Sequence, residues 1–287
     1  RAPAIPPGPA RGGKPPRAAD FLSGGECSLK LTQIRNATVL VEYAEVRFLM
    51  DPMLSPVGTL PPCHSRIRPE TWNPLHELPC PVETLLQVDA VIATHLHPGH
   101  FDQQAAQLLP KDLPIFAQNQ RDAEILQYYG FRQIRILGQG TEFSGVTLTR
   151  TPGQHGNWEE EILKQLGSVC GVVFQTPGEP CLYATGDTVW YPGVAQVTKE
   201  FHPDVVLANA GANMGYRQQV NMGKEDILAL HQALPSAVIV ATHMEDLNHW
   251  TLSRAELKAF ALENGFGCQL LTPQNGECVV FDASWQA

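Results

Sequence analysis

The chain has 287 residues, 43% of them hydrophobic, and a formal net charge of −9 at pH 7. This apolar content can build a sizeable core, but no run reaches the roughly 18 apolar residues of a membrane helix, so no membrane span is expected. The acidic balance argues against a nucleic-acid partner, which would favour a basic surface.

The first 23 residues differ in composition from the rest of the chain. They contain six prolines and three glycines, a composition that neither forms a helix nor packs a core. We expect an arm at residues 1–23, able to lie across a neighbouring subunit in a homo-oligomer. One domain is expected at residues 24–287, because the candidate site residues described below must converge.

The cysteine pattern bears on the cellular compartment. Seven cysteines are scattered and never form C-x-x-C, which fits reduced thiols better than a disulfide framework. The sequence, which starts at Arg1, contains no apolar signal core. These features favour the cytoplasm, whereas a periplasmic or secreted protein would need a leader removed before Arg1.

Alternating apolar residues open the domain and are followed by a long proline-rich segment. Runs at 29–34, 39–41 and 46–50 predict a three-stranded antiparallel meander. Residues 53–81 have almost no periodicity, and a loop of that length is usually functional. We therefore expect it to form a wall or lid of the active site. Its candidate substrate contacts are His64, Arg66, Arg68, Trp72 and His76.

Three histidines fall within six residues at the end of a predicted buried strand. The strand is Val88–Ala93, and His95, His97 and His100 follow it in the pattern H-x-H-x-x-H. Clustered neutral imidazoles are the commonest metal ligands, so this motif predicts a metal site. Three further candidate ligands, His155, Asp187 and His243, each follow an apolar run with the character of a strand.

The remaining elements indicate the fold class. A helix at 120–129 and strands near Ile115, Ile134 and 146–150 complete the first half. In the second half a hairpin is expected at 168–175 and 181–185, helices at 194–201, 224–234 and 253–264, strands at 205–208 and 237–241, and a closing pair near Leu270 and Val279. This order predicts an α/β fold in which two mixed sheets pack face to face with helices outside, a four-layer αββα sandwich.

The ligand order H-x-H-x-x-H, His, Gly-Asp, His resembles that of the metallo-β-lactamase superfamily over residues 28–281. The runs Ala184–Gly193 and Thr242–His249 are similar to the branch typified by the bacterial L-ascorbate 6-phosphate lactonase. The resemblance implies a metal-dependent hydrolase that uses a metal-bound hydroxide on an ester, lactone or phosphodiester, with a lactone favoured. Its implied metal ligands are His95, His97, His100, His155, Asp187 and His243.

One position departs from the superfamily pattern H-x-H-x-D-H. Gly99 stands where the aspartate would bind a second metal, so the resemblance implies a complete first site and a weakened second one. One or two Zn²⁺ ions are expected, with Mn²⁺ as an alternative. Asp102 is the nearest carboxylate that could substitute, but it also begins the helix predicted at 102–109, where a carboxylate suits the helix dipole.

The expected chemistry assigns roles to two further groups of residues. Zn²⁺ held by three imidazoles lowers the pKa of its bound water from about 15.7 to roughly 7, and Asp187 would bridge two ions or bind the hydroxide's proton. His249, six residues after His243, is the candidate for orienting the substrate or donating a proton. The small-molecule substrate could be anionic, since Arg66, Arg68, Arg217 and Lys224 would suit a phosphate or carboxylate.

Two other functions remain open from the sequence. A redox member of the same fold, such as a dioxygenase or a di-iron flavoprotein, is one, but the flavoprotein motif H-x-E-x-D needs glutamate at the position of His97. The other is a non-catalytic binding or sensing module with a site degenerate at Gly99. Against this, six of the seven ligands that the resemblance implies remain.

Overall fold

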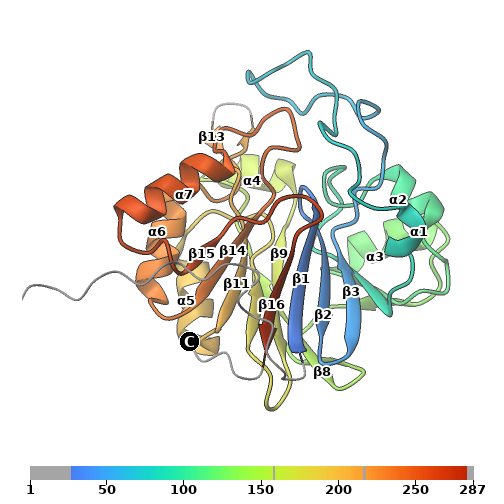
Figure 1. Cartoon of the computed structure of the whole chain (residues 1–287). Helices are drawn as coiled ribbons and strands as arrows, with labels where there is room; N and C mark the ends of the chain where they lie inside the picture. Colours follow the sequence, from blue (N-terminus) through green and yellow to red (C-terminus); the bar gives the residue numbers. More distant parts are fainter. Residues whose placement is uncertain (1–26, 158, 216–217, 283–287) are drawn as a thin grey trace, which may run out of the picture.

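The computed structural model describes residues 27–157, 159–215 and 218–282. The predicted arm at 1–23 and Arg217 lie outside the described residues. Two seven-stranded sheets face each other, and helices cover their outer faces (Figure 1). The predicted αββα sandwich is therefore confirmed.

The first sheet contains the predicted meander. Strands β1, β2 and β3 are antiparallel, and β4, β5 and β6 continue the sheet parallel to β3. The elements of this half are β1 (Cys27–Arg35), β2 (Thr38–Tyr43), β3 (Val46–Met50), α1 (Val82–Leu85), β4 (Ala90–Ala93), α2 (Gln103–Leu108), β5 (Ile115–Ala117), α3 (Gln120–Tyr128) and β6 (Ile134–Ile136).

The second sheet has the order β15-β14-β11-β10-β9-β8-β7. The hairpin of β9 and β10 is antiparallel as predicted, and β10, β11, β14 and β15 are parallel. The elements of this half are β7 (Thr141–Phe143), β8 (Val146–Pro152), α4 (Glu160–Leu166), β9 (Cys170–Gln175), β10 (Leu182–Ala184), α5 (Pro192–Phe201), β11 (Val205–Asn209), β12 (Met214–Gly215), β13 (Gln218–Gln219), α6 (Lys224–Ala233), β14 (Val238–Thr242), α7 (Arg254–Glu263), β15 (Leu270–Leu271) and β16 (Cys278–Asp282).

One predicted pairing is wrong. The strands near Leu270 and Val279 do not pair with each other, because β15 joins β14 in the second sheet and β16 joins β1 in the first. Sequence periodicity cannot assign a short strand to one of two sheets. Strand β7, helix α4 and the small β12–β13 ribbon were also not predicted.

Apolar side chains fill the space between the sheets and the spaces under the helices. Between the sheets, the rings of Phe48 and Phe174 meet edge to face with centroids 5.4 Å apart. Separate buried clusters lie under α2 and α3 on one side and under α5, α6 and α7 on the other. Among the described residues, no helix has both the length and the apolar character needed to cross a membrane.

The strand directions bring the candidate ligands to one edge of the sandwich. Strands β3 and β4 run parallel in the first sheet, and β10, β11 and β14 run parallel in the second. The segments after their carboxyl ends therefore meet at the same edge, where the loop after β3 also lies (Figure 1). This is where open α/β sheets bind ligands.

Candidate metal centre

The first cluster consists of His95, His97 and His155. One ligand atom from each lies within 4.8 Å of the others. His95 follows β4 and is 2% exposed, and His155 follows β8 and is 7% exposed. These distances allow three imidazoles to bind a single ion.

Two ring nitrogens of this cluster have partners in the protein. Nδ1 of His95 lies 3.2 Å from the hydroxyl of Thr94, and Nε2 of His97 donates to the carbonyl of Leu166 at 2.9 Å. Nε2 of His95 and Nδ1 of His155 are buried and have no hydrogen-bond partner. Buried nitrogens without a partner are costly, so this donor set fits a metal ion.

The second cluster contains His100, Asp187 and His243. Nε2 of His100 lies 3.1 Å from Nε2 of His243 and 3.2 Å from Oδ2 of Asp187, and Oδ1 of Asp187 lies 3.6 Å from Nε2 of His243. Asp187 also reaches the first cluster, since its Oδ2 is 3.8 Å from Nδ1 of His155. The structure thus brings together all six predicted ligands.

Asp102 does not contribute to this cluster. Its Oδ1 accepts the backbone N–H of Ala105 at 2.7 Å, which caps α2, and its Oδ2 accepts the backbone N–H of Ser55 at 2.7 Å. Both oxygens are therefore occupied, and the structure favours the helix-capping role over the role of a substitute ligand.

Asp51 is a site residue that sequence reasoning missed. Its Oδ2 accepts hydrogen bonds from Nδ1 of His100 and from the hydroxyl of Thr94, and its Oδ1 accepts the backbone N–H of Thr94. The hydroxyl of Thr94, which Asp51 holds, is also the partner of Nδ1 of His95. One carboxylate therefore orients a histidine of each cluster. The only signal in the sequence was a carboxylate directly after a strand, in the pair Asp51-Pro52.

Replacing Asp51 by asparagine is expected to weaken metal binding at both clusters by roughly 10–100-fold, the usual effect of removing an orienting partner. Asparagine keeps the shape of the side chain, but it has one acceptor oxygen in place of two. It therefore cannot accept hydrogen bonds from all three donors as Asp51 does. Competition with a fluorescent chelator would measure the affinities. Unchanged affinity at both clusters would contradict an orienting role.

Burial and neighbouring charges separate the pKa values of the histidines. Burial, together with the charges of its neighbours, holds the pKa of His95 well below its usual value, and burial lowers that of His155 to about 4. Burial alone would also lower the pKa of His100, but Asp187 and Asp51 raise it to about 10. Burial would raise the pKa of Asp187, yet His243 and His100 hold it well below its usual value. Without a bound ion, burial thus favours the neutral form of His95 and His155, whereas the carboxylates beside His100 favour its protonated form.

The metal-free protein is expected to lose stability as the pH falls from 6.5 to 4. Unfolded His155 binds a proton near pH 6.5, whereas the folded residue does so only near pH 4. The stability that this residue contributes is therefore present above pH 6.5 and lost below it, by about 3 kcal/mol at most. Urea unfolding at several pH values, compared with His155→Gln, would measure this. An equal pH slope in both proteins would contradict the assignment.

The loop at 53–81 is tied to the segment that carries His243 and His249. The link is Asn248, which is fully buried. Its Oδ1 accepts from the backbone N–H of Cys63 and from Nδ2 of Asn73, and its Nδ2 donates to the carbonyls of Ile67 and Arg68. This loop, the predicted wall, is therefore fixed against the segment that follows His243.

The predicted substrate contacts on this wall differ in their exposure and in their contacts. His64 and Arg66 are exposed, and Trp72 is 53% exposed. Arg68 joins the wall to the segment at 245–254, because its guanidinium donates to the carbonyl of Trp250 and stacks on that ring at 4.1 Å. None of these contacts brings the four side chains to the metal ligands.

Cys63 was not predicted as a site residue. Burial raises the pKa of its thiol to about 11, and the negative charge of Asp187 contributes. The thiol therefore lies within electrostatic reach of the metal centre as a neutral group. Nothing in the spacing of the cysteines indicated this.

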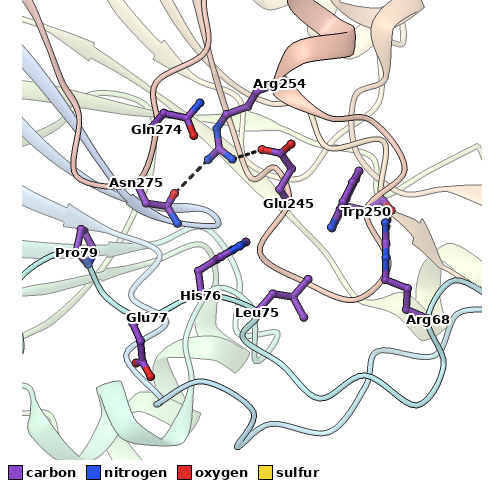
Figure 2. Close-up of a pocket in the computed structure, with 10 residues that line it drawn as sticks. All are labelled: Arg68, Leu75, His76, Glu77, Pro79, Glu245, Trp250, Arg254, Gln274 and Asn275. Carbon is purple, nitrogen blue, oxygen red and sulfur yellow. Dashed lines mark hydrogen bonds and ion pairs between the residues drawn. The ribbon is translucent and has the colours of Figure 1, made fainter.

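A cavity of about 630 Å³ lies between the wall and the segment at 245–254 (Figure 2). Three of its polar side chains are held by Arg254 or by a buried carboxylate: Glu245 and Asn275 pair with Arg254, and His76 pairs with Asp246. Asp246 also accepts the backbone N–H of Asn36 at 2.7 Å. These hydrogen bonds therefore fix the segment that follows His243 to the wall and to the turn at Asn36.

His249, the predicted substrate contact, has one ring nitrogen without a partner. Its Nε2 is buried without a partner. Burial, and then the charge of His243, lowers its pKa to about 3. It is neutral at pH 7 and able to form one further hydrogen bond.

A second cavity, of about 440 Å³, opens beside His155. Its buried lining includes His155 and Val169, whereas Arg121, Glu160 and Lys164 are exposed. Lys164 pairs with Glu160 at 2.8 Å. The inner end is neutral, and the charged groups face solvent.

Comparison with known proteins agrees with the fold and the clustered histidines. Residues 46–244 match the family model described as the beta-lactamase superfamily domain. The chain is 45% identical over 255 residues to the UPF0173 protein YddR of Bacillus subtilis, covering 88% of this chain and all of YddR. It is 23% identical over 260 residues to a UPF0173 metal-dependent hydrolase of Carboxydothermus hydrogenoformans, covering 88% of this chain and all of that protein.

A solved structure extends the likeness. The isothiocyanate hydrolase from Delia radicum gut bacteria superimposes with a TM-score of 0.85 at 42% identity, covering 88% of this chain and 99% of that one. The fold and the histidine cluster define a metal-dependent hydrolase. The chain belongs to the beta-lactamase superfamily, in the UPF0173 group that includes YddR.

Proposed function

We propose that this hydrolase acts on small uncharged electrophiles of the isothiocyanate type, R–N=C=S. The observation that carries the proposal is the neutral, buried end of the cavity beside His155, next to the metal centre. An uncharged reacting group loses little solvation on entering such a site. The likeness to the isothiocyanate hydrolase, at 42% identity, supports the same substrate class.

We further propose Zn²⁺ as the bound ion, with Mn²⁺ as the alternative, because imidazole donors suit zinc. His95, His97 and His155 would hold the first ion. His100, Asp187 and His243 would hold the second. A bound zinc ion lowers the pKa of water to about 7 and so supplies the nucleophile at neutral pH.

The reaction balances with water as the second reactant. The water oxygen adds to the central carbon of R–N=C=S, and its two protons move to nitrogen and sulfur. Cleavage of the C–N bond, with transfer of the sulfur-bound proton to nitrogen, then releases the amine and carbonyl sulfide. His249 would orient the substrate through a hydrogen bond from its neutral imidazole, whose Nε2 has no protein partner.

Benzyl isothiocyanate is a direct probe of this proposal. Its ultraviolet absorbance should disappear, and benzylamine should appear, at a rate that a chelator abolishes and Zn²⁺ restores. A metal-loaded protein that leaves benzyl isothiocyanate intact while it hydrolyses γ-butyrolactone or p-nitrophenyl acetate would overturn the proposal.

Hydrolysis of a lactone is the second candidate. It is favoured by the runs Ala184–Gly193 and Thr242–His249, which contain Asp187, His243 and His249 and are similar to those of the lactonase branch. An anionic lactone would need a free cation, and Arg68 is engaged with Trp250. Comparing a phosphorylated lactone with its neutral parent tests this alternative.

If the loop at 53–81 borders the substrate pocket, Trp72 should affect the kinetics of hydrolysis. This side chain is 53% exposed although the buried Asn73 beside it is fixed to Asn248. Trp72→Ala is expected to raise KM or lower kcat several-fold while the melting temperature changes little, because surface substitutions usually stay within about 0.5 kcal/mol. A large loss of stability with normal kinetics would assign Trp72 to packing instead.

A further inference from the structure

The second cluster has fewer protein donors than a filled metal site usually requires. His100, Asp187 and His243 supply three side chains, one of which is shared with the first cluster. Gly99, directly before His100, supplies none. A Cβ built on Gly99 would lie 3.0 Å from Cδ1 of Leu247 and 3.4 Å from Nδ2 of Asn36. These two side chains fill the space beside Gly99.

Asn36 has a single polar atom without a partner. Its backbone N–H donates to Asp246 at 2.7 Å, its carbonyl accepts the N–H of His243 at 2.9 Å, and its Nδ2 donates to the carbonyl of Gly99 at 2.8 Å. The side-chain oxygen, Oδ1, is buried and makes no hydrogen bond, and the residue is 1% exposed.

The orientation of this amide is determined by its neighbour. The carbonyl of Gly99 can only accept a hydrogen bond, so the amide nitrogen must face it and the oxygen must occupy the other position. Rotation of the amide cannot satisfy Oδ1 without losing the bond to Gly99. The oxygen is thus fixed in place and unpaired.

The position of Asn36 links both ligand loops of the second cluster. Its carbonyl contacts His243 itself, and its side chain contacts the residue before His100. The backbone of Asn36 has φ 53°, in the left-handed region that asparagine tolerates better than most residues. The turn between β1 and β2 therefore places Asn36 in contact with both loops.

We propose that Oδ1 of Asn36 is a further protein donor to the divalent cation of the second cluster. This rests on the proposed function, in which that cluster holds an ion. An amide oxygen is a neutral, hard donor of the kind that suits Mn²⁺ and Mg²⁺. The second cluster should then accept Mn²⁺ more readily than the three-imidazole cluster, which favours Zn²⁺.

Titration of Mn²⁺ into chelator-stripped protein carrying one equivalent of Zn²⁺, followed by electron paramagnetic resonance, tests the donor role without any substrate. Asn36→Ala should weaken the second ion at least about 10-fold, whereas Asn36→Asp, which supplies a carboxylate oxygen, should retain or strengthen it. Both variants lose the Nδ2 bond to Gly99. A role limited to positioning would therefore weaken the second ion equally in both, and that result overturns the proposal.

Two further results keep the test decisive if Asn36→Ala folds poorly. The double variant Asn36→Ala and Gly99→Asp should regain the second ion, because the new carboxylate enters beside the same space and Leu247 is a flexible neighbour. Failure of this rescue in a folded protein, or a wild type that binds only one ion, overturns the proposal. Neither result depends on isothiocyanate turnover, so it is independent of the substrate assignment.

Discussion

Replacing His97 by alanine is expected to remove nearly all metal from the first cluster and to abolish hydrolysis. His97 is one of the three histidines that form this cluster among the described residues, and its Nε2 is engaged by the carbonyl of Leu166, which leaves Nδ1 as its free donor atom. Loss of an orienting partner alone costs about 10–100-fold in affinity, so loss of a donor should cost more than about 100-fold. Elemental analysis after gel filtration would measure the metal that remains.

His64→Ala is the matched control for this metal count. His64 is an exposed histidine on the loop at 53–81 and belongs to neither group of candidate metal ligands among the described residues. The control should keep the metal content of the wild type. A His97→Ala protein that also keeps a full complement would show that the three imidazoles do not form the tighter site.

Replacing Asn248 by alanine is expected to cause the largest loss of stability. The fully buried amide joins Cys63, Ile67, Arg68 and Asn73 through its two side-chain heteroatoms. Its removal leaves several buried groups unpaired at about 1–3 kcal/mol each, and a total of about 3–5 kcal/mol follows after local relaxation. At about 2–4 °C per kcal/mol, the melting temperature should fall by roughly 10 °C.

Asn264→Ala is the matched control for this stability change. Asn264 is exposed and its side chain makes one bond, to the carbonyl of Phe260. Its loss should shift the melting temperature by about 2 °C or less. Equal shifts in the two variants would contradict the role of Asn248 in fixing the wall.

The sequence predicted the fold and the grouping of ligands because both follow from local patterns. Apolar runs locate the strands, and residues after parallel strands meet at one edge. His95, Asp187 and His243 could therefore be placed together before the structure was known. The assignment of β15 and β16 to different sheets depends on long-range packing, which periodicity does not contain.

The roles of Asp51, Asn36 and Asn248 could not be predicted in this way. Asn36 and Asp246 are 210 positions apart, and Asn73 and Asn248 are 175 apart. Such contacts exist only after the two sheets have packed. The exposure of His64, Arg66 and Trp72 likewise depends on how Asn73 and Asn248 dock the loop.

The most direct test of the proposed centre combines a metal count with turnover on the same preparation. We predict that protein purified without chelators contains more than one divalent ion per chain and hydrolyses benzyl isothiocyanate. Stripping the ions should reduce the rate to that of buffer, and Zn²⁺ should restore it in proportion to the occupancy of the site at His95, His97 and His155. Metal-free protein that hydrolyses the probe at the full rate would contradict a metal-dependent mechanism at this centre.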